Sequence, residues 1–173
     1  MDVLSDFSLT KAFFVIALLA AASFDIASYR IPNAIVIALL LGFAIVSLAI
    51  SAQVDWLDHL IAGASLFVAG VLFYSLGQMG AGDVKLLGVI ALWGGTSALL
   101  PLVFWISVSG LLVIIVLLSL RRVVPLLQEW RAISLRASLP KVLVRGEGVP
   151  YGVAICMGTL IAMSMFPRWL WHW

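Results

Sequence analysis

A stretch of 35 residues, Leu86–Leu120, contains no Asp, Glu, Lys or Arg. A helix needs roughly 20 mostly apolar residues to cross a bilayer, so this stretch is too long for a single crossing. It is also too apolar for the surface of a soluble protein. Gly94, Gly95 and Pro101 lie within it, and these residue types favour turns. The stretch therefore predicts two membrane helices joined by a turn.

Apolar sequence of the same kind fills most of the remaining chain. Hydrophobic residues make up 64% of the 173 residues and charged residues only 10%, against about 25% charged residues in soluble domains. We predict an all-α polytopic membrane protein, a single domain over residues 1–173, with about six transmembrane helices. The expected helices cover residues 11–28, 33–52, 60–78, two parts of 86–120, and 149–166.

The basic residues are distributed unequally between the two sides that six crossings create. Loops rich in Lys and Arg face the cytoplasm in multi-pass membrane proteins. One side receives eight of the ten basic residues, and we expect that side to be cytoplasmic. The eight residues are Arg30, Lys85, Arg121, Arg122, Arg131, Arg136, Lys141 and Arg145.

A more polar segment separates the fifth expected helix from the sixth. Apolar side chains recur at helical spacing from Val123 to Leu139, and polar and basic residues occupy much of the remaining surface. This pattern predicts an amphipathic helix on the cytoplasmic leaflet, with its basic residues near anionic headgroups. The alternative is a helix in a solvated loop.

Two of the eight acidic residues, Asp25 and Asp83, lie in otherwise apolar or glycine-rich sequence at membrane boundaries. The predicted topology places both on the cytoplasmic side, where they can meet in the folded bundle. Ionisable residues in membrane segments are candidates for function. A pair of carboxylates suits aspartyl hydrolysis, because one takes a proton from water and the other donates a proton to the scissile carbonyl.

Each of these residues also has a structural interpretation. Asp83 follows two glycines, Gly80 and Gly82, and can be the N-cap of the fourth helix. Asp25 can form an ion pair with Arg30. The glycines are either turn residues or positions that let backbone or substrate approach Asp83 closely.

The helix ends distinguish the two carboxylates. Asp25 is expected near the C-terminal end of the first helix, where the helix dipole disfavours negative charge, and Asp83 at the start of the fourth, where free N–H groups favour it. We therefore expect Asp25 to be the resting acid and Asp83 the resting base, an assignment that the geometry of the pair can reverse. Lys85 either anchors the helix at the interface or supports the ionised form of Asp83.

The chain offers few metal ligands. Its two histidines, His59 and His172, are both assigned to the outer side, and its one cysteine, Cys156, lies within the last expected helix. No zinc-binding set is available at the cytoplasmic face. We expect no metal, no cofactor and no nucleic-acid partner; the lipid bilayer is the partner that the composition implies, and the oligomeric state stays open.

Three short stretches carry a resemblance to a known family. Phe24–Asn33 has the sequence FDIASYRIPN, Gly80–Leu86 has GAGDVKL and Val149–Ile155 has VPYGVAI. In this order they resemble the type IV prepilin peptidase family. The first is similar to its catalytic Asp with a following basic-aliphatic-Pro-Asn turn, the second to its Gly-x-Gly-Asp-x-Lys motif, and the third to the Pro-Tyr-Gly opening of its last helix.

The resemblance implies an aspartyl endopeptidase with Asp25 and Asp83 as catalytic residues. Its expected partner is a prepilin or pseudopilin precursor, whose basic leader peptide is cleaved at the cytoplasmic face of the bacterial inner membrane. Residues expected to bind substrate or support the site come from the same motifs. They are Arg30, Pro32, Asn33, Gly80, Gly82, Lys85, Pro150, Tyr151 and Gly152.

One departure from the longer family members is informative. Those members carry an insertion with paired cysteines and also N-methylate the new pilin terminus, whereas this chain has one cysteine. It therefore resembles the short, peptidase-only branch found in Flp-type (tight-adherence) pilus systems. Composition and topology alone equally allow a small proton- or ion-coupled transporter, or a membrane scaffold, in which Asp25 and Asp83 are coupling carboxylates.

Overall fold

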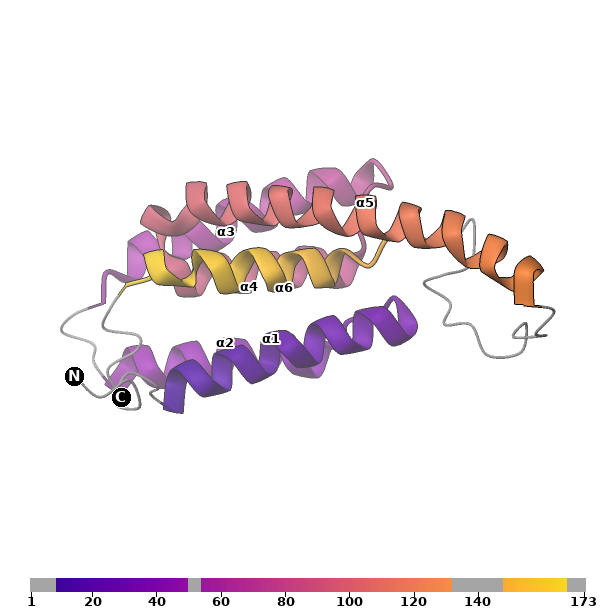
Figure 1. Ribbon diagram of the computed structural model, residues 1–173. Coiled ribbons are helices and arrows are strands. Elements are labelled where there is room, and N and C mark those ends of the chain that lie inside the picture. The colour runs from indigo at the N-terminus through magenta and orange to yellow at the C-terminus, as the bar shows by residue number, and fades with distance from the viewer. Residues whose placement is uncertain (1–8, 50–53, 132–147, 168–173) are drawn as a thin grey trace.

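The computed structural model describes residues 9–49, 54–131 and 148–167. These residues are almost entirely helical and contain no strand, which confirms the all-α prediction. The helices, shown in Figure 1, are α1 (Leu9–Ser28), α2 (Asn33–Ala49), α3 (Trp56–Ser75), α4 (Ala81–Gly94), α5 (Leu99–Arg131) and α6 (Tyr151–Ala162), with short 3-10 helices at Thr96–Ala98 and Met163–Met165.

The turn predicted inside the 35-residue charge-free stretch is present. α4 ends at Gly94, and Gly95 has a φ of 70°, a left-handed conformation that glycine adopts without a steric penalty. Asp58, in the first turn of α3, fixes this turn by accepting hydrogen bonds from Thr96, one from the backbone N–H at 3.0 Å and one from the hydroxyl. The turn is therefore tied to the start of α3.

Several helix boundaries differ from the prediction, and two of the differences are informative. α3 begins at Trp56 rather than at Leu60, because the Asp55 side chain caps the helix and accepts hydrogen bonds from two backbone N–H groups of its first turn. α5 continues through Pro125 to Arg131 and extends beyond the bundle in Figure 1. The expected amphipathic segment is thus not a separate helix over residues 123–131, which continue α5; residues 132–139 lie outside the described residues.

Burial, rather than length alone, distinguishes α4 as the interior helix. Within the described chain, α1, α3 and the segment Thr96–Val123 are long and apolar enough to cross a membrane, and α2 and Tyr151–Met165 are shorter apolar helices. α4 has only 14 residues, a rise of about 21 Å at ~1.5 Å per residue, against a hydrocarbon core about 30 Å thick. Ten of its 14 residues are buried, so other helices surround it.

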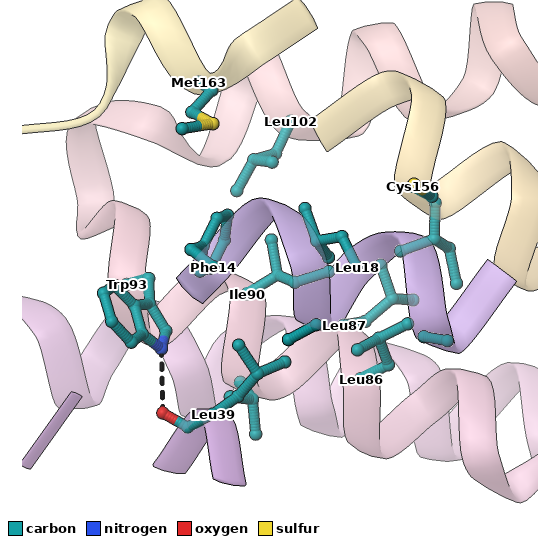
Figure 2. Close-up of a cluster of buried hydrophobic side chains, with 14 of the residues drawn as sticks. Phe14, Leu18, Leu39, Leu86, Leu87, Ile90, Trp93, Leu102, Cys156 and Met163 are labelled. Carbon is teal, nitrogen blue, oxygen red and sulfur yellow. Dashed lines mark hydrogen bonds between the residues drawn. The ribbon is translucent and has the colours of Figure 1, made fainter. Parts of the chain in front are cut away.

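Trp93 joins α4 to its neighbours in the core. It is fully buried, and its Nε1–H donates a hydrogen bond of 3.0 Å to the backbone carbonyl of Leu39 on α2, drawn as a dashed line in Figure 2. Its ring lies 4.9 Å from that of Phe14 on α1 and 5.9 Å from that of Phe43 on α2. These contacts fix the position of α4, which carries Asp83 in its first turn.

Close backbone contacts hold neighbouring helices together. A Cβ atom on Gly158 of α6 would lie 2.5 Å from the Cα and N of Ile106 on α5. A Cβ on Gly63 of α3 would lie 3.1 Å from the carbonyl oxygen of Gly88 on α4. Small residues at such positions let helix backbones approach closely, which is the usual basis of helix packing in membranes.

We therefore expect Gly158→Ala to destabilise the protein by about 1–3 kcal/mol, the usual cost of overpacking. Thermal unfolding in detergent measures the effect. Gly110→Ala on α5 is the matched control, because its new methyl group would meet nothing nearer than Ala154 Cβ at 3.8 Å. Both variants gain the same helix propensity, so equal unfolding temperatures for the two would contradict the close α5–α6 contact.

Candidate active site

Asp25 and Asp83 line one cavity of about 290 Å³. Both side chains are buried, with exposed fractions of 4% and 7%. Two carboxylates that line one small cavity would repel each other if both were ionised, so such a pair tends to share one proton. The other residues of the cavity are Tyr29, Arg30, Ile31, Asn33, Gly80, Ala81, Gly82 and Lys85.

The Asp25 carboxylate is held by the start of α6. Its Oδ2 accepts a hydrogen bond of 2.7 Å from the backbone N–H of Gly152, the second residue of that helix. A Cβ on Gly152 would lie 2.9 Å from both Cβ and Oδ2 of Asp25. Only glycine therefore allows this hydrogen bond at its present distance. Pro150, expected to support the site, is the N-cap of α6.

The Asp83 carboxylate is held by the start of its own helix. Asp83 is the third residue of α4, and Gly80, not Asp83, is the N-cap. Asp83 Oδ2 accepts a hydrogen bond of 3.3 Å from the Gly80 N–H, as the third residue does in a capping box. Oδ1 is buried and accepts no hydrogen bond from the described residues. Leaving a buried acceptor unpaired costs free energy, and of the two carboxylates in the cavity it is Asp83 that has such an oxygen.

Both carboxylates thus lie at helix N-termini. Asp25 is near the C-terminal end of α1, as expected, but its oxygen contacts the N-terminus of α6. Free N–H groups favour negative charge at either position. The assignment of Asp25 as the resting acid and Asp83 as the resting base rested on their lying at opposite helix ends. Because both carboxylates contact a helix N-terminus, this difference is largely lost.

Lys85 and Asn33 connect α4 to α2 at the rim of the cavity. Lys85 Nζ donates a hydrogen bond of 2.9 Å to Asn33 Oδ1, and both side chains are exposed. Arg30 also lines the cavity and is exposed, and the structure shows no ion pair between it and Asp25. The ion-pair interpretation of Asp25 is therefore not supported.

Gly82 brings the start of α4 against the loop between α1 and α2. A Cβ on Gly82 would lie 3.1 Å from Ile31 Cβ. Pro32 follows in the same loop, and its carbonyl accepts the N–H of Ile35 in the first turn of α2, but Pro32 does not line the cavity. Tyr151 lines a separate, apolar cavity of about 530 Å³ between α3, α4, α5 and α6, which has no carboxylate among its lining residues.

The potential metal ligands stay apart. No group of three or more His, Cys, Asp and Glu side chains in the described ranges could hold a metal ion. His59 is buried on α3, with Nδ1 2.6 Å from the carbonyl of Leu92. Cys156 is buried within α6.

Two residues beside the site were not predicted, Tyr29 and Arg121. Tyr29 lines the cavity, and its hydroxyl donates a hydrogen bond of 3.3 Å to the carbonyl of Gly148. Arg121 Nη2 donates a hydrogen bond of 2.9 Å to the same carbonyl. Tyr29 lies in the Phe24–Asn33 stretch that carries the family resemblance but was not singled out there. Arg121 is the first charge after the long apolar stretch and was interpreted only as a topological charge.

A comparison with family models bears on the chemistry of this site. The model of the type IV leader peptidase family matches residues 12–115, more than half of the 173 residues. The chain belongs to this family. Searches among curated proteins and among solved structures gave no match. Membership confirms the resemblance found in the sequence and identifies the protein as a protease of the leader-peptidase type. Asp25 and Asp83 lie inside the matched residues, and α6 lies beyond them.

We expect Gly152→Ala to lower peptidase activity, because the added methyl group would displace the Asp25 carboxylate from the Gly152 N–H. A hydrogen bond to a charged group contributes about 1.5–3 kcal/mol, so the rate should fall about ten- to a hundredfold. The measurement is the initial rate of leader-peptide cleavage in detergent, with Gly110→Ala as the control. A wild-type rate for Gly152→Ala would show that this contact is dispensable.

Proposed function

We propose that this protein is a membrane-embedded aspartyl endopeptidase that removes the basic leader peptide from prepilin-like precursors, with Asp25 and Asp83 as its catalytic pair. The observation that carries the proposal is the shared cavity of the two buried carboxylates, one of which keeps an unpaired oxygen. Family membership supplies the reaction class, hydrolysis of a leader peptide. In this proposal residues 1–173 act as one peptidase domain.

The geometry suits water activation by a carboxylate pair. The ionised carboxylate takes a proton from a water molecule, whose oxygen attacks the scissile carbonyl carbon. The protonated carboxyl group donates its proton to the carbonyl oxygen, and a proton then passes to the leaving nitrogen. A water molecule needs about 30 Å³, and the cavity of about 290 Å³ has room for it beside a peptide bond.

The backbone donors leave the reacting oxygens available. Gly152 N–H occupies only Oδ2 of Asp25, and Gly80 N–H occupies only Oδ2 of Asp83. The unpaired Asp83 Oδ1 can therefore accept a proton shared by the pair. Either carboxylate can act as the base, since each has one donor at a helix N-terminus.

The distribution of charge supports an active site at the cytoplasmic face of the bacterial inner membrane. Arg30 and Lys85 line the cavity itself. Arg121 is joined to Gly148, four residues before the Gly152 that contacts Asp25. Basic residues gather on the cytoplasmic side of membrane proteins, and the long apolar helices fit a location in the bilayer.

We expect Asp25→Asn and Asp83→Asn each to reduce cleavage by about a hundredfold or more, because both carboxyl groups move protons in the reaction. The measurement is conversion of a precursor to mature pilin in membranes, together with the amount of protease in the membrane. Asp55→Asn is the matched control, since Asn caps a helix about as well as Asp and Asp55 caps α3, away from the cavity.

Substantial cleavage by either Asn variant would remove that residue from the catalytic pair. If the wild-type protein cleaves no precursor but moves protons or ions into vesicles, and both Asn variants stop that movement, the ion-coupled transporter replaces the peptidase. Intact membrane insertion of the variants is required in either case, because a misfolded protein would lose both activities.

A further inference from the structure

The backbone carbonyl of Gly148 is the meeting point of three parts of the chain. It accepts hydrogen bonds from the hydroxyl of Tyr29, at 3.3 Å, and from Nη2 of Arg121, at 2.9 Å. Tyr29 directly follows α1, Arg121 belongs to α5, and Gly148 lies two residues before Pro150, the N-cap of α6. The residue directly after α1 and a residue within α5 therefore hold the segment that leads into α6.

This contact is linked to Asp25 through a closed ring, which three hydrogen bonds, the Tyr29 residue and the main chain from Gly148 to Gly152 form together. Tyr29 N–H donates to the main-chain carbonyl of Asp25 at 2.8 Å, and Gly152 N–H donates to its Oδ2 at 2.7 Å. Asp25 and Tyr29 are one helical turn apart, and Gly148 is four residues before Gly152 along the chain, in the segment that leads into α6. A displacement of Gly148 would therefore move the N–H group that holds the Asp25 carboxylate.

The backbone of Tyr29 shows that this arrangement carries a cost. Its φ is 53°, in the left-handed region, and among the described non-glycine residues it is the one with positive φ. Helices commonly end with a residue in this conformation, but that residue is usually glycine. A tyrosine is kept there only when its surroundings fix it. The hydrogen bond from its hydroxyl to Gly148 is one such contact.

The burial of Arg121 indicates that this residue makes a specific contact in the fold, in addition to any effect on membrane orientation. Its exposed fraction is 9%, whereas the neighbouring Arg122 is exposed. A guanidinium group donates in a fixed planar geometry, and hydrogen bonds from a charged donor are stronger than those between neutral groups. Arg121 is thus suited to hold the Gly148 carbonyl in place.

We propose that Tyr29 and Arg121 are positioning residues that hold the start of α6 through Gly148, so that Gly152 N–H stays on the Asp25 carboxylate. The inference rests on the proposed catalytic role of Asp25. Neither residue needs to touch the substrate for this role, which predicts an effect on turnover rather than on substrate binding.

The test uses the full chain in detergent and a prepilin-derived substrate, with kcat and KM measured separately. Tyr29→Phe removes one donor and should lower kcat about three- to tenfold. Arg121→Met removes the charged donor and should lower kcat at least about tenfold. KM should stay within about twofold in both variants. Arg121→Lys keeps a cationic donor and should restore part of the lost kcat.

Matched controls come from the same residue types outside the ring. Tyr74→Phe changes an exposed tyrosine of α3, and Arg122→Met changes the exposed arginine next to Arg121. Both should keep the wild-type kcat. Hydrogen exchange gives a readout independent of turnover: the Gly152 amide should exchange faster in Arg121→Met than in Arg122→Met, because its hydrogen bond to Asp25 is loosened.

A raised KM with unchanged kcat in Tyr29→Phe would overturn the proposal and make Tyr29 a substrate contact. Unchanged kcat and Gly152 exchange in Arg121→Met, even with a lower unfolding temperature, would also overturn it and leave a purely structural contact. Asp25→Asn in the same assay distinguishes a failure of the proposed function from a failure of the positioning role. If that variant cleaves normally, the proposed function has failed; if it is inactive while Tyr29→Phe and Arg121→Met are normal, only the positioning role has failed.

Discussion

Two carboxylates are buried in a bundle whose other interior residues are mostly apolar. The helix starts around the cavity supply the hydrogen-bond donors that these carboxylates require. A buried charge is costly unless it has hydrogen-bond donors. Asp25 and Asp83 each receive one backbone N–H, from Gly152 and Gly80. Backbone donors at helix starts have no partner within the helix, so they are available for this purpose. The position of each helix start therefore determines where a carboxylate can lie.

Glycine acts in the same way in the candidate site and in helix packing: because it has no side chain, other groups can approach its backbone closely. At Gly152 the missing side chain lets a donor reach Asp25, and at Gly158, further along the same helix, it lets the backbones of α5 and α6 come together. Both contacts exclude a Cβ atom on steric grounds. Close contacts thus position α6 along its length, and its first turn carries the N–H donor to Asp25.

Local patterns in the sequence were sufficient for much of this architecture. The helical class, the turn after Gly94 and the pairing of Asp25 with Asp83 followed from apolar runs, glycines and carboxylates that stand out in their surroundings. The end of α5 did not, because Pro125 usually marks a helix boundary and here lies inside the helix.

Contacts between distant helices could not be predicted from such local patterns. The strained backbone of Tyr29 and the double hydrogen bond to Gly148 depend on how α1, α5 and α6 pack, and no periodicity encodes this. The Asp25–Gly152 hydrogen bond joins residues 127 positions apart, and residue 152 lies beyond the part that matches the leader peptidase family. Asp25 therefore gains its donor only when α6 has packed against α1. The candidate site is complete only when α6 is in place, so a change that loosens α6 should affect both the site and the bundle.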